Sequence, residues 1–352
     1  MTKTIIWSPV TAYYDNLPLP GSGVMKANAP WSGHFEVQPA LWATAHTTQF
    51  AEPGWRYLDA GCGLLPGGGS YVTLLSPDGT DYSIIVETVD APVPQAVVFE
   101  LDPALASGPL RVWRSDANEM FAQLPDVVPE AGRLAMRFQG GSIYSLTTTT
   151  GQTHGAYEPP APAPFPLPYV EDFESTRRGA TPRFFSDQAG VFEVVKKRDG
   201  RGQALRQVID RKGIEWHFHW NPHPETFLGD VGWKDYSVSV DALLEQQGFV
   251  SLFGRVGTVP QNENLPAAYW LKVSDAGYWE LGNARVPLAS GRCGFRPGRW
   301  HNLRLSFRGE MIRVAIDARE VAVVQNAEHA AGMVGVGSGW HGAQFDNLRI
   351  EP

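Results

Sequence analysis

Apolar and polar residues alternate along much of the chain, which is the pattern of a β-strand with one buried face. The alternation is clearest in residues 236–242 and 300–307, where apolar side chains fall on one face and polar side chains on the other. Shorter runs rich in β-branched and aromatic residues, such as 71–75 and 82–88, are bounded by glycine, proline or aspartate. The pattern therefore predicts an all-β protein.

Prolines divide the chain into two parts. Six of them fall within the eleven residues 158–168, and proline has no N–H to contribute to a sheet. We interpret this segment as a linker between a β-sandwich at residues 36–157 and a second domain at residues 169–352. The second domain contains many short strand-like runs, which predict a lectin-like jelly roll of two sheets.

The first residues differ from the rest of the chain. A short apolar strand at residues 5–7, followed by a helix-like segment at residues 8–16, is typical of a βα unit rather than of a sandwich. We therefore treat residues 1–35 as a separate fragment that is too short to form a domain alone.

Composition narrows the choice of partners. Glycine and proline account for 37 and 28 of the 352 residues and charged residues for 19%, so many tight turns are expected. A formal net charge of -8 gives no reason to bind a polyanion, and we expect no nucleic-acid partner.

Two cysteines, Cys62 and Cys293, are too few for a disulfide framework. We find neither a signal peptide nor an apolar run long enough for a transmembrane segment, and the localisation stays open.

A glycine-rich turn at residues 57–63 resembles the first loop of methyltransferases that bind S-adenosylmethionine. That loop requires a following helix, whereas here Pro66 and three glycines lead straight into the strand predicted at 71–75. We therefore interpret the turn as a hairpin loop.

Three histidines lie close together in the second domain. His217 and His219 would share one face of a strand, and His223 follows four residues later, a spacing that some metal sites use. Because prolines at positions 222 and 224 interrupt any regular continuation, we favour the alternative interpretation of a partly exposed polar face.

Each end of the second domain carries an aspartate, Asp172 near its start and Asp346 near its end. The first and last strands of a jelly roll commonly pair, which would bring these carboxylates together. Two close carboxylates repel unless a hard cation such as Ca²⁺ joins them, so an ion site is one interpretation. The other is that both are solvated charges at strand edges.

Runs with characteristic aromatic, histidine and glycine residues follow one another along the whole chain, at residues 5–7, 12–14, 30–34, 45–50, 53–55, 68–72, 187–193, 205–208 and 343–347. Together they resemble the galactocerebrosidase family, glycoside hydrolase family 59. The resemblance runs from end to end and is more specific than any single motif above.

The resemblance implies a three-part enzyme: a (β/α)8 barrel, a β-sandwich and a C-terminal lectin-like domain. Such an enzyme removes galactose from galactosylceramide with retention, using two glutamates. Residues 1–35 would then be a remnant of the barrel, its last βα unit, and both glutamates would lie upstream of Met1. A retaining glycosidase needs two carboxyl groups about 5 Å apart, so we expect no catalytic residue in this chain.

The resemblance also implies binding residues. Trp7 would form an aromatic wall of the galactose site, and Trp216 would lean over the same pocket from the lectin-like domain, because an indole face packs well on the C–H face of a sugar. The alternative for each is a core tryptophan. A structural Ca²⁺ would be bound by two side chains and two carbonyls, those of Asp172, Asp346, Glu174 and Gln203.

Two positions depart from the family pattern. Asn118 lies near the place of an arginine that reaches the active site, and Leu19 stands where a pocket tyrosine is expected. Losing a cation and a phenol changes which sugar hydroxyls can be bound. We therefore expect the substrate to be galactosylceramide or a related β-galactoside.

Three functional hypotheses follow. The first is a galactocerebrosidase-like glycoside hydrolase whose non-catalytic C-terminal portion is this chain, with a galactoside or glycolipid head group as ligand. The second is a stand-alone module that binds a glycan or glycolipid. The third is the accessory half of a split glycosidase whose barrel is a separate chain.

Overall fold

The computed structural model describes residues 6, 8–12, 14–17, 23–103, 105, 108–197, 200–213, 223–259, 265–283 and 286–352. Strands predominate, as predicted, and the chain divides into two compact units. The N-terminal unit comprises Met1–Pro9, Gly23–Met25 and Glu36–Pro159, and the C-terminal unit comprises Val10–Ser22, Lys26–Phe35 and Pro160–Pro352.

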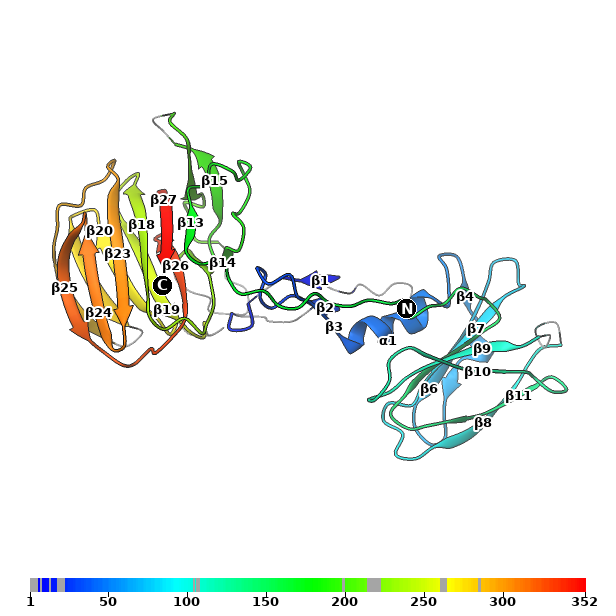
Figure 1. Ribbon diagram of the computed structural model, residues 1–352. Coiled ribbons are helices and arrows are strands. Elements are labelled where there is room, and N and C mark those ends of the chain that lie inside the picture. The colour runs from blue at the N-terminus through cyan, green and yellow to red at the C-terminus, as the bar shows by residue number, and fades with distance from the viewer. Residues whose placement is uncertain are drawn as a thin grey trace. The chain divides into compact units, whose positions relative to one another are not determined.

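Two antiparallel sheets form the body of the N-terminal unit (Figure 1). The larger sheet has the order β10-β9-β12-β7-β6-β4 with β5 paired to β6, and the smaller sheet contains only β11 and β8. Between the sheets lie buried apolar residues such as Val86, Leu110 and Leu146. The strands are β4 (Arg56–Tyr57), β5 (Gly63–Leu64), β6 (Ser70–Leu75), β7 (Tyr82–Glu87), β8 (Gln95–Glu100), β9 (Leu110–Ser115), β10 (Ala122–Val127), β11 (Arg133–Phe138) and β12 (Ile143–Thr147).

The glycine-rich turn at residues 57–63 is a loop between short strands, although it does not join two strands of one hairpin as predicted. It contains the 3-10 turn η1 (Asp59–Gly61), and the flanking strands β4 and β5 both pair with β6. The chain continues from this loop into a strand and not into the helix that a cofactor-binding turn requires.

The helix lies later in the chain than we predicted. The described residues of the segment 8–16 include a strand, β1 (Val10–Thr11), and no helix, so the predicted helix there is wrong. Two further short strands, β2 (Met25–Lys26) and β3 (Glu36–Val37), precede α1 (Pro39–Thr48). Proline suits the first turn of a helix, where its missing N–H would be unpaired anyway. No helix in the described residues is long and apolar enough to cross a membrane.

A buried histidine attaches α1 to the larger sheet. The His46 ring lies 2.9 Å from Ser145 Oγ through Nδ1 and 2.8 Å from Ser115 Oγ through Nε2. Because Ser145 donates its own proton to the carbonyl of His46, its oxygen accepts from Nδ1–H, which leaves Nε2 to accept from Ser115. Burial lowers the pKa of His46 to about 4, so the ring is neutral at pH 7.

Two large antiparallel sheets form the C-terminal unit (Figure 1). Their orders are β15-β16-β27-β18-β23-β24-β25, with β13 paired to β27, and β14-β17-β26-β19-β20-β21-β22. The first and last strands of residues 169–352, β13 and β27, therefore pair, as predicted. The strands are β13 (Tyr169–Glu171), β14 (Ser186–Ala189), β15 (Phe192–Lys196), β16 (Gln203–Gln207), β17 (Glu225–Leu228), β18 (Tyr236–Leu244), β19 (Phe249–Val256), β20 (Tyr269–Ser274), β21 (Tyr278–Asn283), β22 (Pro287–Arg292), β23 (His301–Arg308), β24 (Met311–Ile316), β25 (Arg319–Gln325), β26 (Met333–Ser338) and β27 (Ala343–Glu351).

Residues from the start of the chain pack on this second unit. The Tyr14 hydroxyl donates to the Phe184 carbonyl at 2.6 Å, and Asn16 Nδ2 donates to the Gly257 carbonyl at 2.6 Å. The proline-rich segment 158–168 contains no strand, and near its end Phe165 is buried against Trp233, with ring centroids 5.0 Å apart. The last residues of this segment therefore belong to the packed structure.

Candidate functional site

A cavity of about 300 Å³ lies on the sheet of the C-terminal unit that contains β17, β26, β19 and β20. The period of two along these strands explains its lining. On β19, Val250 and Leu252 enter the core, while the intervening residues, including Ser251, face the other way. The cavity-lining residues used below are His223, Glu225, Phe249, Trp270, Lys272 and Ser338.

Two polar atoms at this cavity have no hydrogen-bond partner among the described residues. They are Trp270 Nε1 and His223 Nδ1, and both are buried. A buried polar atom without a partner costs about 1–3 kcal/mol. Such atoms in a cavity indicate a place where a polar ligand or water completes the hydrogen bonding.

Charged and aromatic groups surround these atoms. Lys272 Nζ lies 4.1 Å from the ring centroid of Phe249, and the edge of the His223 ring faces the same phenylalanine at 5.0 Å. Burial first, and then the charge of Lys272, lower the pKa of His223, so its ring is neutral at pH 7. Glu225 is 2% exposed and brings a carboxyl group to the cavity. The cavity thus combines aromatic surface with donors and acceptors of both kinds.

A second histidine fixes one wall of the cavity. His341 Nε2 accepts hydrogen bonds from the Phe249 N–H at 3.2 Å and the Gly339 N–H at 3.1 Å. Burial lowers the pKa of His341 and so preserves this accepting nitrogen. Gly248 has φ of 150°, and a Cβ there would lie 2.2 Å from His341 Nε2, so only glycine fits. The start of β19, and with it Phe249, is held in place.

Several of the predicted site residues are not among those that the structure describes. Trp7 and Trp216 lie outside the described residues, as do Leu19, His217 and His219. Of the three clustered histidines only His223 is described, and it lines the cavity. The described part of the chain contains no group of three or more histidine, cysteine, aspartate or glutamate side chains arranged for a metal.

Two of the predicted calcium ligands are in direct contact. The Gln203 N–H donates to Glu174 Oε1 at 2.8 Å, and Gln203 Nε2 donates to the Glu174 carbonyl at 3.1 Å. Strand β13 pairs with β27 so that Glu171 is opposite Leu348. This register places Asp172 and Asp346 at the same end of the strand pair.

A lysine neutralises the buried aspartate of this group. Asp346 is 4% exposed and forms an ion pair with Lys197. Burial raises the pKa of Asp346, and the lysine acts in the opposite direction. Asp241 is opposite Asp346 on the neighbouring strand β18. The carboxylate and carbonyl oxygens suit a hard cation in type, but a cation at Asp346 would have to replace Lys197.

Buried carboxylates of the described residues include Glu225 and Asp346. They belong to different sheets, on β17 and β27, and do not form the close pair that retaining glycosidases use. Asn118, the position that departs from the family arginine, is exposed, and its N–H donates to Asp116. The carboxylates of Glu225 and Asp346 are therefore not a catalytic pair.

Two antiparallel sandwiches, one with a small aromatic cavity rich in donors and acceptors, define a lectin-like all-β protein. The family model described as "Galactocerebrosidase, C-terminal lectin domain" matches residues 187–352, and that of "Glycosyl hydrolase family 59" matches residues 1–49. The chain belongs to glycoside hydrolase family 59.

Curated relatives match the chain over its whole length. Galactocerebrosidase of Danio rerio is 33% identical over 99% of this chain and 58% of its own length. The Mus musculus and Homo sapiens galactocerebrosidases are 32% and 29% identical over 100% of this chain and 56% of their own lengths. The chain thus spans somewhat more than half of the relatives it matches. Among solved structures, the carbohydrate-binding module CBM66 from Bacillus subtilis has a TM-score of 0.37 at 14% identity, covering 48% of this chain and 96% of that one.

Proposed function

We propose that this chain is the carbohydrate-binding portion of a galactocerebrosidase-like glycoside hydrolase that acts on galactosylceramide or a related β-galactoside. The observation that carries the proposal is the cavity at Trp270 and His223, where two buried nitrogen atoms lack partners within the described part of the chain. Family membership supplies the class of ligand, and the cavity supplies the groups that bind it.

Each group at the cavity has a role in this proposal. The indole of Trp270 packs on the C–H face of the sugar, and its N–H donates to a ring hydroxyl. Lys272 donates to further hydroxyls, and Glu225 accepts from them. A volume of about 300 Å³ is at the lower end for small-molecule pockets and suits one sugar ring. Trp7 and Trp216 remain our proposed aromatic walls of a galactose site.

Hydrolysis is assigned to no residue of this chain. The reaction needs a nucleophile and an acid/base on either side of the glycosidic bond, and the buried carboxylates Glu225 and Asp346 belong to different sheets. The proposal therefore predicts that the purified chain alone does not turn over a chromogenic β-galactoside. Turnover well above background would contradict this part of the proposal.

For the metal, we propose that Ca²⁺ binds Asp172 and Asp346 together with the carbonyls of Glu174 and Gln203. The type of donor and the shared end of the strand pair support this proposal. Calcium, when bound, would replace Lys197 as the counter-charge of Asp346 and would tie the two ends of the C-terminal unit together.

A second candidate function is a stand-alone module that binds a glycan or glycolipid. It is favoured by the fact that every residue of the cavity belongs to the C-terminal unit. The accessory half of a split glycosidase, with a barrel on a separate chain, would use the same cavity. A soluble barrel that restores turnover when it is mixed with this chain would distinguish the split enzyme from the module.

The binding proposal can be tested by calorimetric titration with methyl β-galactoside. Trp270→Ala should weaken binding at least tenfold, because both the stacking surface and the indole N–H are lost. Tyr278→Ala is the matched control, since Tyr278 is an aromatic residue on β21 of the same sheet, is 46% exposed and does not line the cavity. Equal affinities for the parent and the Trp270 variant would reject this cavity as the sugar site.

A further inference from the structure

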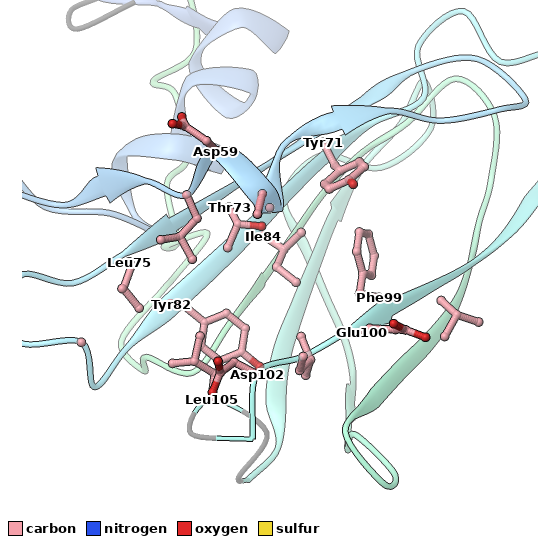
Figure 2. A pocket seen from close by; sticks show the side chains of 16 residues that line it. Asp59, Tyr71, Thr73, Leu75, Tyr82, Ile84, Phe99, Glu100, Asp102 and Leu105 are labelled. Atoms are coloured by element: carbon pink, nitrogen blue, oxygen red, sulfur yellow. The ribbon is translucent and has the colours of Figure 1, made fainter.

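A cavity of the N-terminal unit lies between its two sheets. It has a volume of about 770 Å³ and is lined by β6 and β7 of the larger sheet and by β8 of the smaller one (Figure 2). The smaller sheet has only two strands, so it leaves part of the larger sheet uncovered. The volume is within the range of small-molecule pockets.

The walls of this cavity are mainly apolar. Side chains of Leu75, Ile84 and Phe99 line it from three strands, and Tyr71 packs edge-to-face on Phe99 with ring centroids 5.1 Å apart (Figure 2). Leu75 and Ile84 are buried at 8% and 2% exposure. An alkyl chain in this space would bury its surface against theirs, at about 25 cal/mol per Å².

A tyrosine brings a hydroxyl group to the cavity. Tyr82 is 2% exposed and projects into the cavity (Figure 2). Burial raises the pKa of Tyr82, so the phenol remains protonated and able to donate or accept. This hydroxyl offers a hydrogen bond to a polar group of a ligand.

The charged residues among the described lining of the cavity are acidic. Its lining includes three carboxylate residues, Asp59, Glu100 and Asp102, and no lysine, arginine or histidine. Glu100 forms an exposed ion pair with Arg133 at 3.2 Å. The carboxylate of Asp59, on η1, has no hydrogen bond or ion pair with the described residues. An anionic head group would be repelled here, whereas a cation would find a counter-charge.

We propose that this cavity binds an amphiphile that has one alkyl chain and one protonated amine. The alkyl chain lies between the sheets, and the amine pairs with Asp59 at the mouth. The proposal concerns the N-terminal unit alone and does not depend on the sugar site of the C-terminal unit.

Calorimetric titration of the whole chain at pH 7 tests the proposal, with decylamine, decyl sulfate and decanol as probes. Decylamine should bind once per chain and at least tenfold more tightly than either of the others. Binding of decylamine no tighter than that of decyl sulfate or decanol would overturn the assignment of an amine.

Two variants locate the binding. Asp59→Asn should weaken decylamine binding about fivefold while leaving decanol binding unchanged, because only the charge pair is lost. Leu58→Trp should weaken the binding of both probes by filling the mouth of the cavity. Glu52→Gln is the control, since Glu52 is an exposed carboxylate of the same unit that does not line the cavity.

Circular dichroism shows whether each variant is folded. If Asp59→Asn binds decylamine as tightly as the parent does, the amine does not pair with Asp59 and the proposal is overturned. This holds whether or not Leu58→Trp folds. The Asp59 variant is the decisive one, because an exposed aspartate on a turn is replaced without disturbing the core.

Discussion

The two units of the chain are both antiparallel sandwiches, yet their cavities lie in different places. In the C-terminal unit, two sheets of seven or more strands cover one another, and the space between them is filled by fully buried residues such as Leu252 and Leu305. Its cavity is on the other side of a sheet. In the N-terminal unit a two-stranded sheet faces a seven-stranded one, and the cavity lies between the sheets. The number of strands that cover a sheet thus decides whether its apolar face is filled by the protein or left open to a ligand.

Truncating one leucine in each unit tests this comparison most strongly. Leu252→Ala should cost about 4 kcal/mol of unfolding free energy, because it opens a void in a filled core. Leu75→Ala should cost about 2 kcal/mol, since one side of Leu75 already borders a cavity. Denaturant titration of both variants measures the difference. Equal losses would show that the N-terminal core is as tightly packed as the C-terminal one.

The buried histidine of the N-terminal unit predicts a pH dependence. The pKa of His46 falls from 6.5 to about 4 on folding. Between these pH values the imidazole is protonated in the unfolded chain and neutral in the folded chain. The folded state should therefore lose about 3 kcal/mol of stability as the pH falls from 6.5 towards 4. In His46→Asn this pH-dependent loss should be absent. Parallel denaturation curves of both proteins from pH 7 to pH 4.5 would show the difference, and identical pH profiles would contradict it.

The buried ion pair of the C-terminal unit predicts a loss of stability when its lysine is replaced. Lys197→Met should destabilise the unit by about 3 kcal/mol, because the Asp346 carboxyl is left buried without its counter-charge. If Ca²⁺ binds as proposed, millimolar calcium should restore most of the stability that the variant has lost. A chelator should then lower the stability of the variant again. Lys196→Met, at the exposed neighbouring position, is the control.

Thermal unfolding with and without chelator separates the two parts of that prediction. If the Lys197 variant is destabilised and calcium does not change its stability, the ion pair is confirmed as a stabilising contact and the calcium site is rejected. A variant as stable as the parent would reject the ion pair as a stabilising contact.

The smallest expected effect concerns the wall of the sugar cavity. Gly248→Ala should shift the start of β19 away from His341 and weaken binding of methyl β-galactoside about threefold, because the added methyl group has no room. Gly294→Ala is the matched control, since a Cβ there meets nothing within 4 Å. Unchanged binding in Gly248→Ala would show that this wall does not position the sugar.

Part of the candidate site could be read from the sequence. Residues 269–274 alternate between core residues such as Leu271 and cavity residues such as Trp270 and Lys272, and the large or charged side chains on the second face signal a binding surface. The spacing of His223 is compatible with a metal site or with a partly exposed polar face, and the structure places its ring against Phe249. The ion pair of Lys197 with Asp346 joins residues from distant strands and had no local signature.

The all-β class, the many turns and the membership of the family could be inferred from the sequence alone. These depend on the period of two, on glycine and proline, and on ordered runs of residues, which are all local along the chain. The position of the helix, the unit that holds Tyr14 and the faces that remain open as cavities became known only from the folded structure. Those outcomes depend on how many strands cover each sheet and on which distant side chains meet, and alternation within a single strand carries no information about either.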